Sequence, residues 1–220
     1  MATAPRDHDL TVPLSRAIDA YNGGWRTVDE ELYALCRRRN GPRDFADAYA
    51  KVAVIGRVYA AGVARSWNGS GDAETETAKV LADAEVAELI QDRLQRIGDH
   101  PFDRCRARQI VELHGHVTRA ISRRSGNVFL TSFVSKYLHF HCPIVPIYDS
   151  NAQSAVGTFV ERRRVNGVRK DLVDLPESVW AYRNFVAAFV VLHERAYAET
   201  TLQPSVKEID HLLWQPTRST

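Results

Sequence analysis

The 220-residue sequence predicts an all-α fold. Apolar residues recur every three or four positions, as in Phe45, Tyr49 and Val52, which is the period of a helix with one buried face. The capping-box pattern, a hydroxyl residue followed three positions later by glutamate, occurs at 27–30 and again at 205–208. Outside short apolar runs, no stretch alternates apolar and polar residues as a half-buried strand would. We therefore expect helices throughout.

The first half of the chain predicts four helices. One should begin at the capping box and run to residue 39, where Gly41 and Pro42 stop it. The second should start at Asp44 and bury a stripe from Phe45 to Val63. After a glycine-rich loop at 67–72, an acidic amphipathic helix should continue to about residue 97. A further helix is expected over 103–122.

The second half is built around a proline-containing elbow. A helix is expected over 128–140, Pro143 and Pro146 prevent helix across the elbow, and Asp149 can cap a helix reaching about residue 164. A tight turn is expected at 165–167, and helices at 182–197 and 205–213 complete the chain. We expect one domain with its core over about 25–215, two helical lobes around a cleft, and a flexible segment at 1–15.

Composition narrows the class of protein. Hydrophobic residues make up 45% and charged residues 25% of the chain, which is ordinary globular usage. No stretch approaches the roughly 20 apolar residues of a membrane span, and the polar N-terminus lacks a signal-peptide core. Three cysteines without CxxC spacing fit a reducing compartment. We expect a cytoplasmic protein without membrane contact.

Arginine is distributed unevenly although the net charge is only +2. Segregated basic stretches can form a surface that binds phosphate groups, but either stretch alone is more often a solvated helix face. The two stretches comprise Arg104, Arg106, Arg108, Arg119, Arg123 and Arg124, and then Arg162, Arg163, Arg164, Arg169 and Lys170.

The elbow should bring together Lys136, near the end of one helix, and Asp149, at the start of the next. A carboxylate at a helix N-terminus is favoured in its ionised form, and it could stabilise a cationic, oxocarbenium-like sugar or deprotonate a nucleophile. A desolvated lysine amine could attack the C1′ carbon of that sugar and form a Schiff base. On spacing alone, a helix cap and a solvated lysine are the commoner explanations.

The segments LTSFVSK (130–136) and PIYDS (146–150) resemble the helix-hairpin-helix DNA glycosylases, and are similar to bacterial proteins with the 8-oxoguanine DNA glycosylase fold. The helix at 55–62 is similar to the same group. In bifunctional members of that superfamily a lysine attacks C1′, and the resemblance implies this role for Lys136. It implies that Asp149 is the essential carboxylate of mono- and bifunctional members. Ser132 and Val134 stand where the family hairpin carries glycines, and the interval from lysine to aspartate is shorter.

A glycosylase extrudes its target nucleotide and holds the base between aromatic or apolar side chains. Trp25, Trp67, Tyr59 and Tyr148 are candidates for stacking, although aromatic residues at helical spacing are more often core. The residues expected to contact DNA or the base are Trp67, Arg123, Arg124, Ser125, Asn127, Ser135, His139, Tyr148 and Ser150.

The histidine pairs at 114–116 and 139–141 suggest zinc, but H-x-H ligands diverge on a helix. We therefore expect no metal and no cofactor. The leading hypothesis is a monomeric glycosylase that excises a damaged or modified base from duplex DNA, with a bulky hypermodified base of phage DNA, and hence antiviral defence, as one candidate. The alternatives are a non-catalytic DNA- or protein-binding module, in which Lys136 and Asp149 form a structural salt bridge, and a metal-dependent hydrolase.

Overall fold

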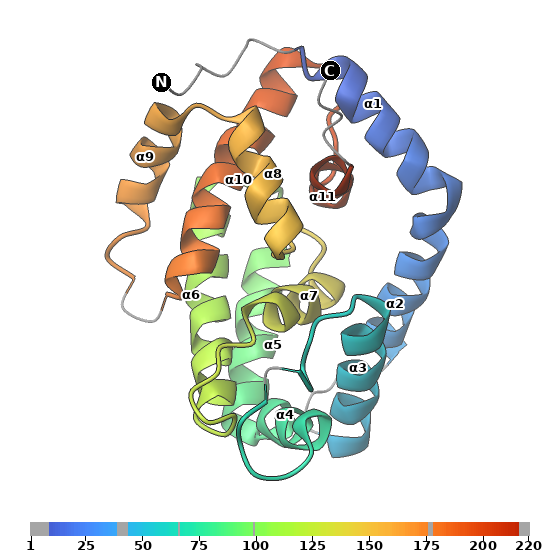
Figure 1. The fold of residues 1–220 in the computed structure, drawn as a ribbon, viewed down its shortest axis with the longest axis vertical. Helices are drawn as coiled ribbons and strands as arrows, with labels where there is room; N and C mark the ends of the chain where they lie inside the picture. The colour runs from blue at the N-terminus through green and yellow to red at the C-terminus, as the bar shows by residue number, and fades with distance from the viewer. Residues whose placement is uncertain (1–8, 39–43, 66, 99, 176–177, 216–220) are drawn as a thin grey trace.

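The computed structural model describes residues 9–38, 44–65, 67–98, 100–175 and 178–215, and within these ranges every regular element is helical (Figure 1). The elements in chain order are α1 (Thr11–Ala20), the π-helical turn η1 (Tyr21–Trp25), α2 (Arg26–Arg38), α3 (Phe45–Val58), α4 (Ala73–Ala82), α5 (Ala84–Gly98), α6 (Arg104–Ser122), α7 (Thr131–His141), α8 (Ser150–Phe159), α9 (Arg162–Asp171), α10 (Trp180–Glu199) and α11 (Val206–Trp214). The predicted all-α class is confirmed.

Side-chain caps fix where many of these helices begin. The side chains of Asp44, Asp72, Asp103 and Asp149 each accept a hydrogen bond from a backbone N–H in the first turn of the helix that follows. Ser205 and Glu208 form a complete capping box at α11, as predicted.

The capping box predicted at 27–30 is wrong. The chain runs from α1 through η1 into α2 without leaving helical geometry, so Thr27 lies inside a helix with no free N-terminus to cap. Helical structure also begins earlier than expected. Leu10 and Leu14 are buried, which ties α1 to the core, and of the segment expected to be flexible only residues 1–8 lie outside the described ranges.

Several predicted boundaries also need correction. The acidic helix is two helices, because the backbone of Asp83 is non-helical (φ −59°, ψ 134°) and its side chain accepts hydrogen bonds from Glu85 and Val86 N–H. Residues 165–167 lie inside α9 and form no turn. The helix after Asp149 ends at Phe159, and α7 begins at Thr131 instead of residue 128. In α3, Phe45 is 43% exposed, and the buried positions are Ala48, Lys51, Val52 and Ile55.

Helix α7 lies in the middle of the molecule (Figure 1). It packs against α2, α3 and α6, whereas α8 packs against α10 and α11, and α11 against α1. Buried apolar side chains from all these helices join in one connected cluster. The elbow between α7 and α8 therefore passes through the core, and it places the end of α7 close to the start of α8.

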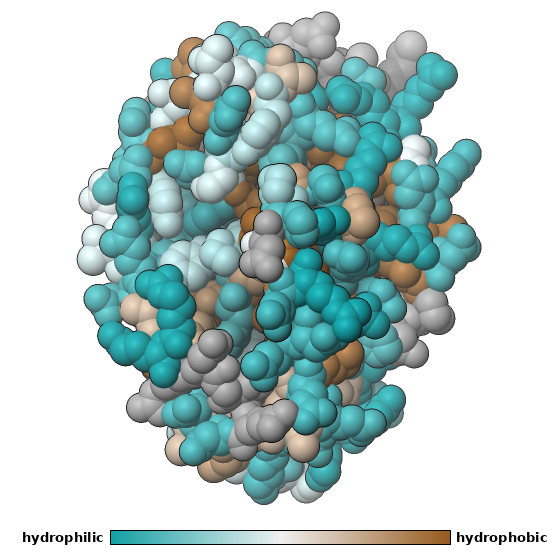
Figure 2. Space-filling model, turned by 180° about the vertical axis from the view of Figure 1, so that it is seen from behind, coloured by the Kyte–Doolittle hydropathy of each residue, from teal (hydrophilic) through white to brown (hydrophobic). Residues whose placement is uncertain are grey.

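Hydrophilic side chains cover most of the face seen in Figure 2, with smaller apolar patches among them. None of the described helices combines the length and the apolar character that crossing a bilayer requires.

Candidate active site

Lys136 and Asp149 come together as the sequence predicted. Lys136 lies in the second turn of α7 and Asp149 is the N-cap of α8. The lysine Nζ is 3.9 Å from Asp149 Oδ2. This separation allows a charge interaction but is too long for a direct hydrogen bond.

The Lys136 amine is almost completely removed from water, with its side chain 3% exposed. Its Nζ donates hydrogen bonds to Ser132 Oγ at 2.9 Å and to the backbone oxygen of Tyr59 at 3.4 Å. Burial lowers the pKa of Lys136, while the charges of Asp149 and Asp210 act in the opposite direction. A lowered pKa increases the fraction of neutral, nucleophilic amine near neutral pH.

Both oxygens of the Asp149 carboxylate have hydrogen-bond donors. The backbone N–H of Ala152 donates to Oδ1 at 2.8 Å, and the indole N–H of Trp214 donates to Oδ2 at 3.0 Å. The side chain is 13% exposed. The α8 N-terminus and the indole therefore hold this carboxylate in a fixed orientation, with part of its surface open to solvent.

A pocket of about 350 Å³ adjoins this pair of residues. Four aromatic side chains line the pocket: Trp25, Tyr59, His211 and Trp214. The other lining residues are Ala20, Val58, Ala60, Lys207, Asp210 and Gln215. Two lining residues also contact the charged pair: Trp214 donates to Asp149, and the carbonyl of Tyr59 accepts from Lys136. Lys136 and Asp149 therefore each contact a lining residue, although neither of them lines the pocket itself.

Three buried charged groups lie together beside the pocket, and two of them, Lys207 and Asp210, line it. Lys207 Nζ is 2.9 Å from Asp210 Oδ2 and 3.5 Å from Asp29 Oδ2, and it lies 4.9 Å from the centre of the Tyr59 ring. The Tyr59 hydroxyl donates to Asp29. Burial raises the pKa of both aspartates, and Lys207 opposes that effect.

Sequence reasoning missed this triad and the role of Trp214. The spacing of Lys207 and Asp210 is also that of an ordinary surface ion pair. The available signal was the lysine and aspartate within an otherwise apolar face of the helix containing Ile209, Leu212 and Leu213, all buried in the structure.

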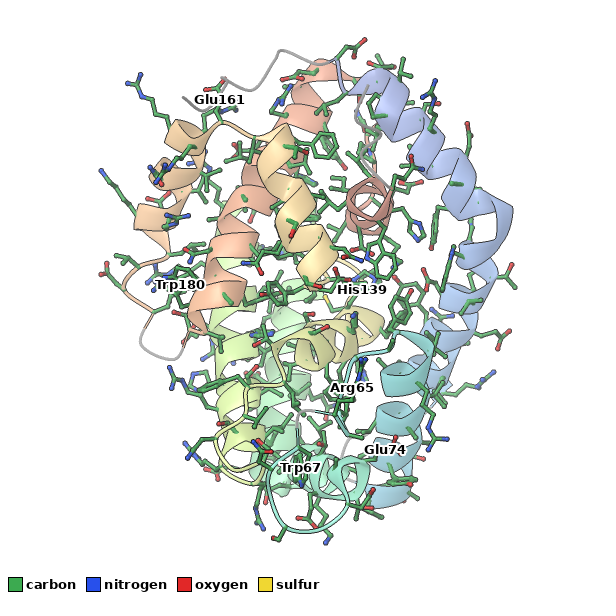
Figure 3. The ribbon with its side chains drawn as sticks, in the orientation of Figure 1. Arg65, Trp67, Glu74, His139, Glu161 and Trp180 are labelled. Carbon is green, nitrogen blue, oxygen red and sulfur yellow. The ribbon has the colours of Figure 1, made fainter. Side chains whose placement is uncertain are left out.

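The expectation that His139 and Ser135 contact DNA is wrong for this structure, because both side chains are fully buried. His139 lies in the interior of the molecule (Figure 3). Its Nδ1–H donates to the carbonyl of Val145 at 2.7 Å, and its Nε2 accepts from the Tyr33 hydroxyl. The Ser135 hydroxyl accepts a hydrogen bond from the backbone N–H of Tyr148 at 3.0 Å. Both residues hold the elbow in place.

The turn at 125–127 packs against the loop containing Asn68 and Gly69. A Cβ added to Gly69 would lie 2.2 Å from the carbonyl oxygen of Arg124, so the two backbones are in close contact. Ser125 is buried and donates to the carbonyl of Val128 at 2.8 Å, which corrects the expectation that it contacts DNA. Arg123, Arg124 and Asn127 are exposed.

The remaining predicted contacts divide into two groups. Tyr148 and Ser150 flank Asp149; Tyr148 is half-buried, with its hydroxyl donating to Gln153 at 2.6 Å, and Ser150 is exposed. Trp67 lies near α4 at the lower end of the molecule, well away from His139 (Figure 3). It is half-buried against the core and does not line the aromatic pocket. Of the four stacking candidates, only Trp25 and Tyr59 line that pocket.

The segment that the resemblance assigns to the hairpin, 130–136, is helical from Thr131 onward. The connection between α6 and α7 instead covers residues 123–130. Ser132, which stands at a hairpin glycine position, faces the lysine and accepts its hydrogen bond.

His114, one of the histidines considered as a zinc ligand, serves as a packing residue. His114 is fully buried, its ring stacks on Tyr182 with centroids 3.7 Å apart, and its Nε2–H donates to the carbonyl of Thr131 at 3.0 Å. Among the described residues, no group of three or more histidine, cysteine, aspartate or glutamate side chains is arranged to hold a metal ion.

The two basic stretches differ in their surroundings. Arg104 is paired with Glu194 at 2.7 Å, and Arg108 donates to the carbonyl of Asp171 at 2.6 Å, so these arginines join α6 to neighbouring segments. All five cationic residues of the second stretch are exposed on α9, whose buried positions are Val165 and Val168.

Comparison with known proteins adds no relative: no family model, no curated protein and no solved structure matches the chain.

Proposed function

We propose that the protein is a DNA glycosylase that acts through Asp149, with Lys136 as a nucleophilic amine. The observation that carries the proposal is the 3.9 Å approach of Lys136 Nζ to Asp149 Oδ2 next to an aromatic pocket of about 350 Å³. The resemblance of the segments 130–136 and 146–150 to helix-hairpin-helix glycosylases supports the same reaction.

The proposed reaction breaks the bond between C1′ and the base nitrogen. The electron pair of that bond leaves with the base, and positive charge develops on the sugar ring. The negative charge of Asp149 stabilises that cation. Either water or the neutral amine of Lys136 then bonds to C1′ and gives up one proton, which the departed base takes up. In the amine adduct the C1′–O4′ bond then breaks, the second amine proton passes to O4′, and the C1′=N bond of a Schiff base forms.

The surface offers cations for the DNA backbone. Arg123 and Arg124 are exposed beside the loop at 68–69, and α9 presents Arg162, Arg163, Arg164, Arg169 and Lys170 to solvent. Contacts of this kind bind phosphates without reading sequence. In this proposal the two helical lobes of a glycosylase correspond to the α2–α7 and α8–α11 sides of the elbow.

The proposal is tested by incubating duplex oligonucleotides that carry different modified bases with the protein, followed by alkali to cut the abasic sites. After alkali, DNA treated with wild type should show strand breaks at one class of modified base. DNA treated with Asp149→Asn should show none. Asparagine caps helices as well as aspartate does, so α8 should be retained. Asp103→Asn, the same change at the N-cap of α6, is the matched control and should behave as wild type.

The alternative is a binding module in which Lys136 and Asp149 form only a structural salt bridge. Its support is that Lys136 already bonds Ser132 and Tyr59 within the protein. This hypothesis predicts that Asp149→Asn retains DNA binding. It also predicts that neither the variant nor wild type releases a base from any of the modified duplexes.

A further inference from the structure

The aromatic pocket contains one carboxylate oxygen with unused hydrogen-bonding capacity. Asp210 lines the pocket and is 2% exposed. Its Oδ2 accepts from Lys207 Nζ at 2.9 Å, but no donor in the described part of the chain reaches Oδ1. A buried polar atom without a partner lowers stability by leaving its desolvation uncompensated. Such an atom in a pocket wall indicates a ligand that supplies the missing donor.

The neighbouring cation, Lys207, interacts with groups of the protein. Lys207 Nζ is directed at Asp210, at Asp29 and at the face of the Tyr59 ring. Its Nζ donates a hydrogen bond to Asp210 Oδ2, whereas the 3.5 Å approach to Asp29 Oδ2 is an ion pair without a hydrogen bond. Among the residues that line the pocket, Asp210 is the one whose side chain keeps a buried acceptor without a donor from the described residues.

The remaining walls fit a flat, unsaturated ring. Trp25 and Trp214 line the pocket and remain 47% and 45% exposed, so each keeps aromatic surface that a ligand could cover. Burial, aided by the charge of Lys207, lowers the pKa of His211 to about 4, so its ring is neutral at pH 7. The volume of about 350 Å³ lies at the lower end of the roughly 300–1,000 Å³ of small-molecule sites.

We infer that this pocket selects planar heterocycles that present an amino group to Asp210 Oδ1, the class that contains adenine, guanine and cytosine. The inference rests on the proposed function in one respect, which is that the pocket receives the base extruded from DNA. Hypoxanthine and uracil carry a carbonyl oxygen in place of the amino group. That oxygen would face Asp210 Oδ1, and two acceptors cannot form a hydrogen bond.

Binding of free bases to the full-length protein tests the selectivity without any bond cleavage. Adenine and hypoxanthine differ by an amino group replaced with a carbonyl, and cytosine and uracil differ in the same way. Isothermal titration calorimetry should show adenine and cytosine binding at least about tenfold more tightly than their carbonyl counterparts. Equal affinities, the reverse order, or no binding of any of the four bases would overturn the inference.

Asp210→Asn gives a sharper readout than loss of binding. Lys207 Nζ donates to the Oδ2 position, so the asparagine carbonyl should occupy that side and its amide N–H₂ should face the pocket. The acceptor becomes a donor, and hypoxanthine and uracil should then bind more tightly than adenine and cytosine. Retention of the wild-type order, or equal loss for both classes, contradicts the role of Asp210.

Asp92→Asn, an exposed change in α5 with the same loss of charge, is the matched control and should keep the wild-type order. If Asp210→Asn does not fold, the four affinities of the wild type decide the question. Selective binding of free bases without excision from any duplex would retain the pocket assignment and refute only the glycosylase.

Discussion

The indole N–H of Trp214 donates to Asp149 Oδ2 at 3.0 Å, across 65 positions of sequence. Trp214 is the last residue of α11 and Asp149 immediately precedes α8, so the contact joins the ends of two packed helices. The same indole forms a wall of the aromatic pocket. A base in that pocket would therefore lie against the group that orients the proposed catalytic carboxylate.

Replacing Trp214 with phenylalanine should separate these two roles. The Trp214→Phe variant keeps an aromatic wall but loses the donor to Asp149. A hydrogen bond to a charged group contributes about 1.5–3 kcal/mol, so kcat for base release should fall roughly 10- to 100-fold. Affinity for free adenine should change little, whereas Trp214→Ala should weaken both. Unchanged kcat in Trp214→Phe would show that the indole N–H does not assist the carboxylate.

Covalent trapping by borohydride should depend on pH in a way set by Lys136. Burial lowers the pKa of this lysine, so its neutral amine appears below the ordinary value of 10.5. The rate of trapping should therefore rise with pH and reach half its maximum below pH 10.5. Lys136→Met, which keeps the length of the side chain, should give no adduct. A midpoint at or above 10.5, or an adduct in the variant, would exclude Lys136 as a desolvated nucleophile.

Stability should fall in mild acid because burial keeps histidines such as His114 and His139 in the neutral form. Burial lowers the pKa of His114 and of His139 to about 3, against 6.5 in an unfolded chain. Between these values the unfolded state binds more protons, so stability decreases as pH falls. From pH 7 to pH 5 the loss should be about 2 kcal/mol for each histidine.

Urea unfolding at the two pH values measures this loss. His114→Phe, which can still stack on Tyr182, should lose about 2 kcal/mol less than wild type over the same interval. An identical loss in the variant would show that His114 does not contribute.

The contact between the two loops predicts opposite effects of glycine substitutions. Gly69→Ala should destabilise the fold by about 1–3 kcal/mol, since a Cβ there would meet the Arg124 backbone oxygen at 2.2 Å. Gly157→Ala is the control: it lies in α8 with nothing within 4 Å, and should stabilise by about 0.5–1 kcal/mol. Thermal unfolding of both variants checks the signs, and a stabilising Gly69→Ala would contradict the close contact.

The sequence was informative where local chemistry decides the structure. Asp149 was identified as a helix cap because a short carboxylate before a helical segment satisfies free N–H groups, and the prolines located the elbow that brings Lys136 to it. It failed at Thr27, since continuous helix from α1 made a cap unnecessary. Nor could it show that Trp214 reaches Asp149 or that Lys207 lies between two buried aspartates, because these contacts depend on tertiary packing.

The role of Asp149 is tested most directly by mass-spectrometric measurement of the free base released from modified duplex DNA. Wild type and Asp103→Asn should release the same base in equal yield, and Asp149→Asn should release none above the level without protein. Equal yields from wild type and Asp149→Asn would contradict the assignment of Asp149 as the group that stabilises the departing base's sugar.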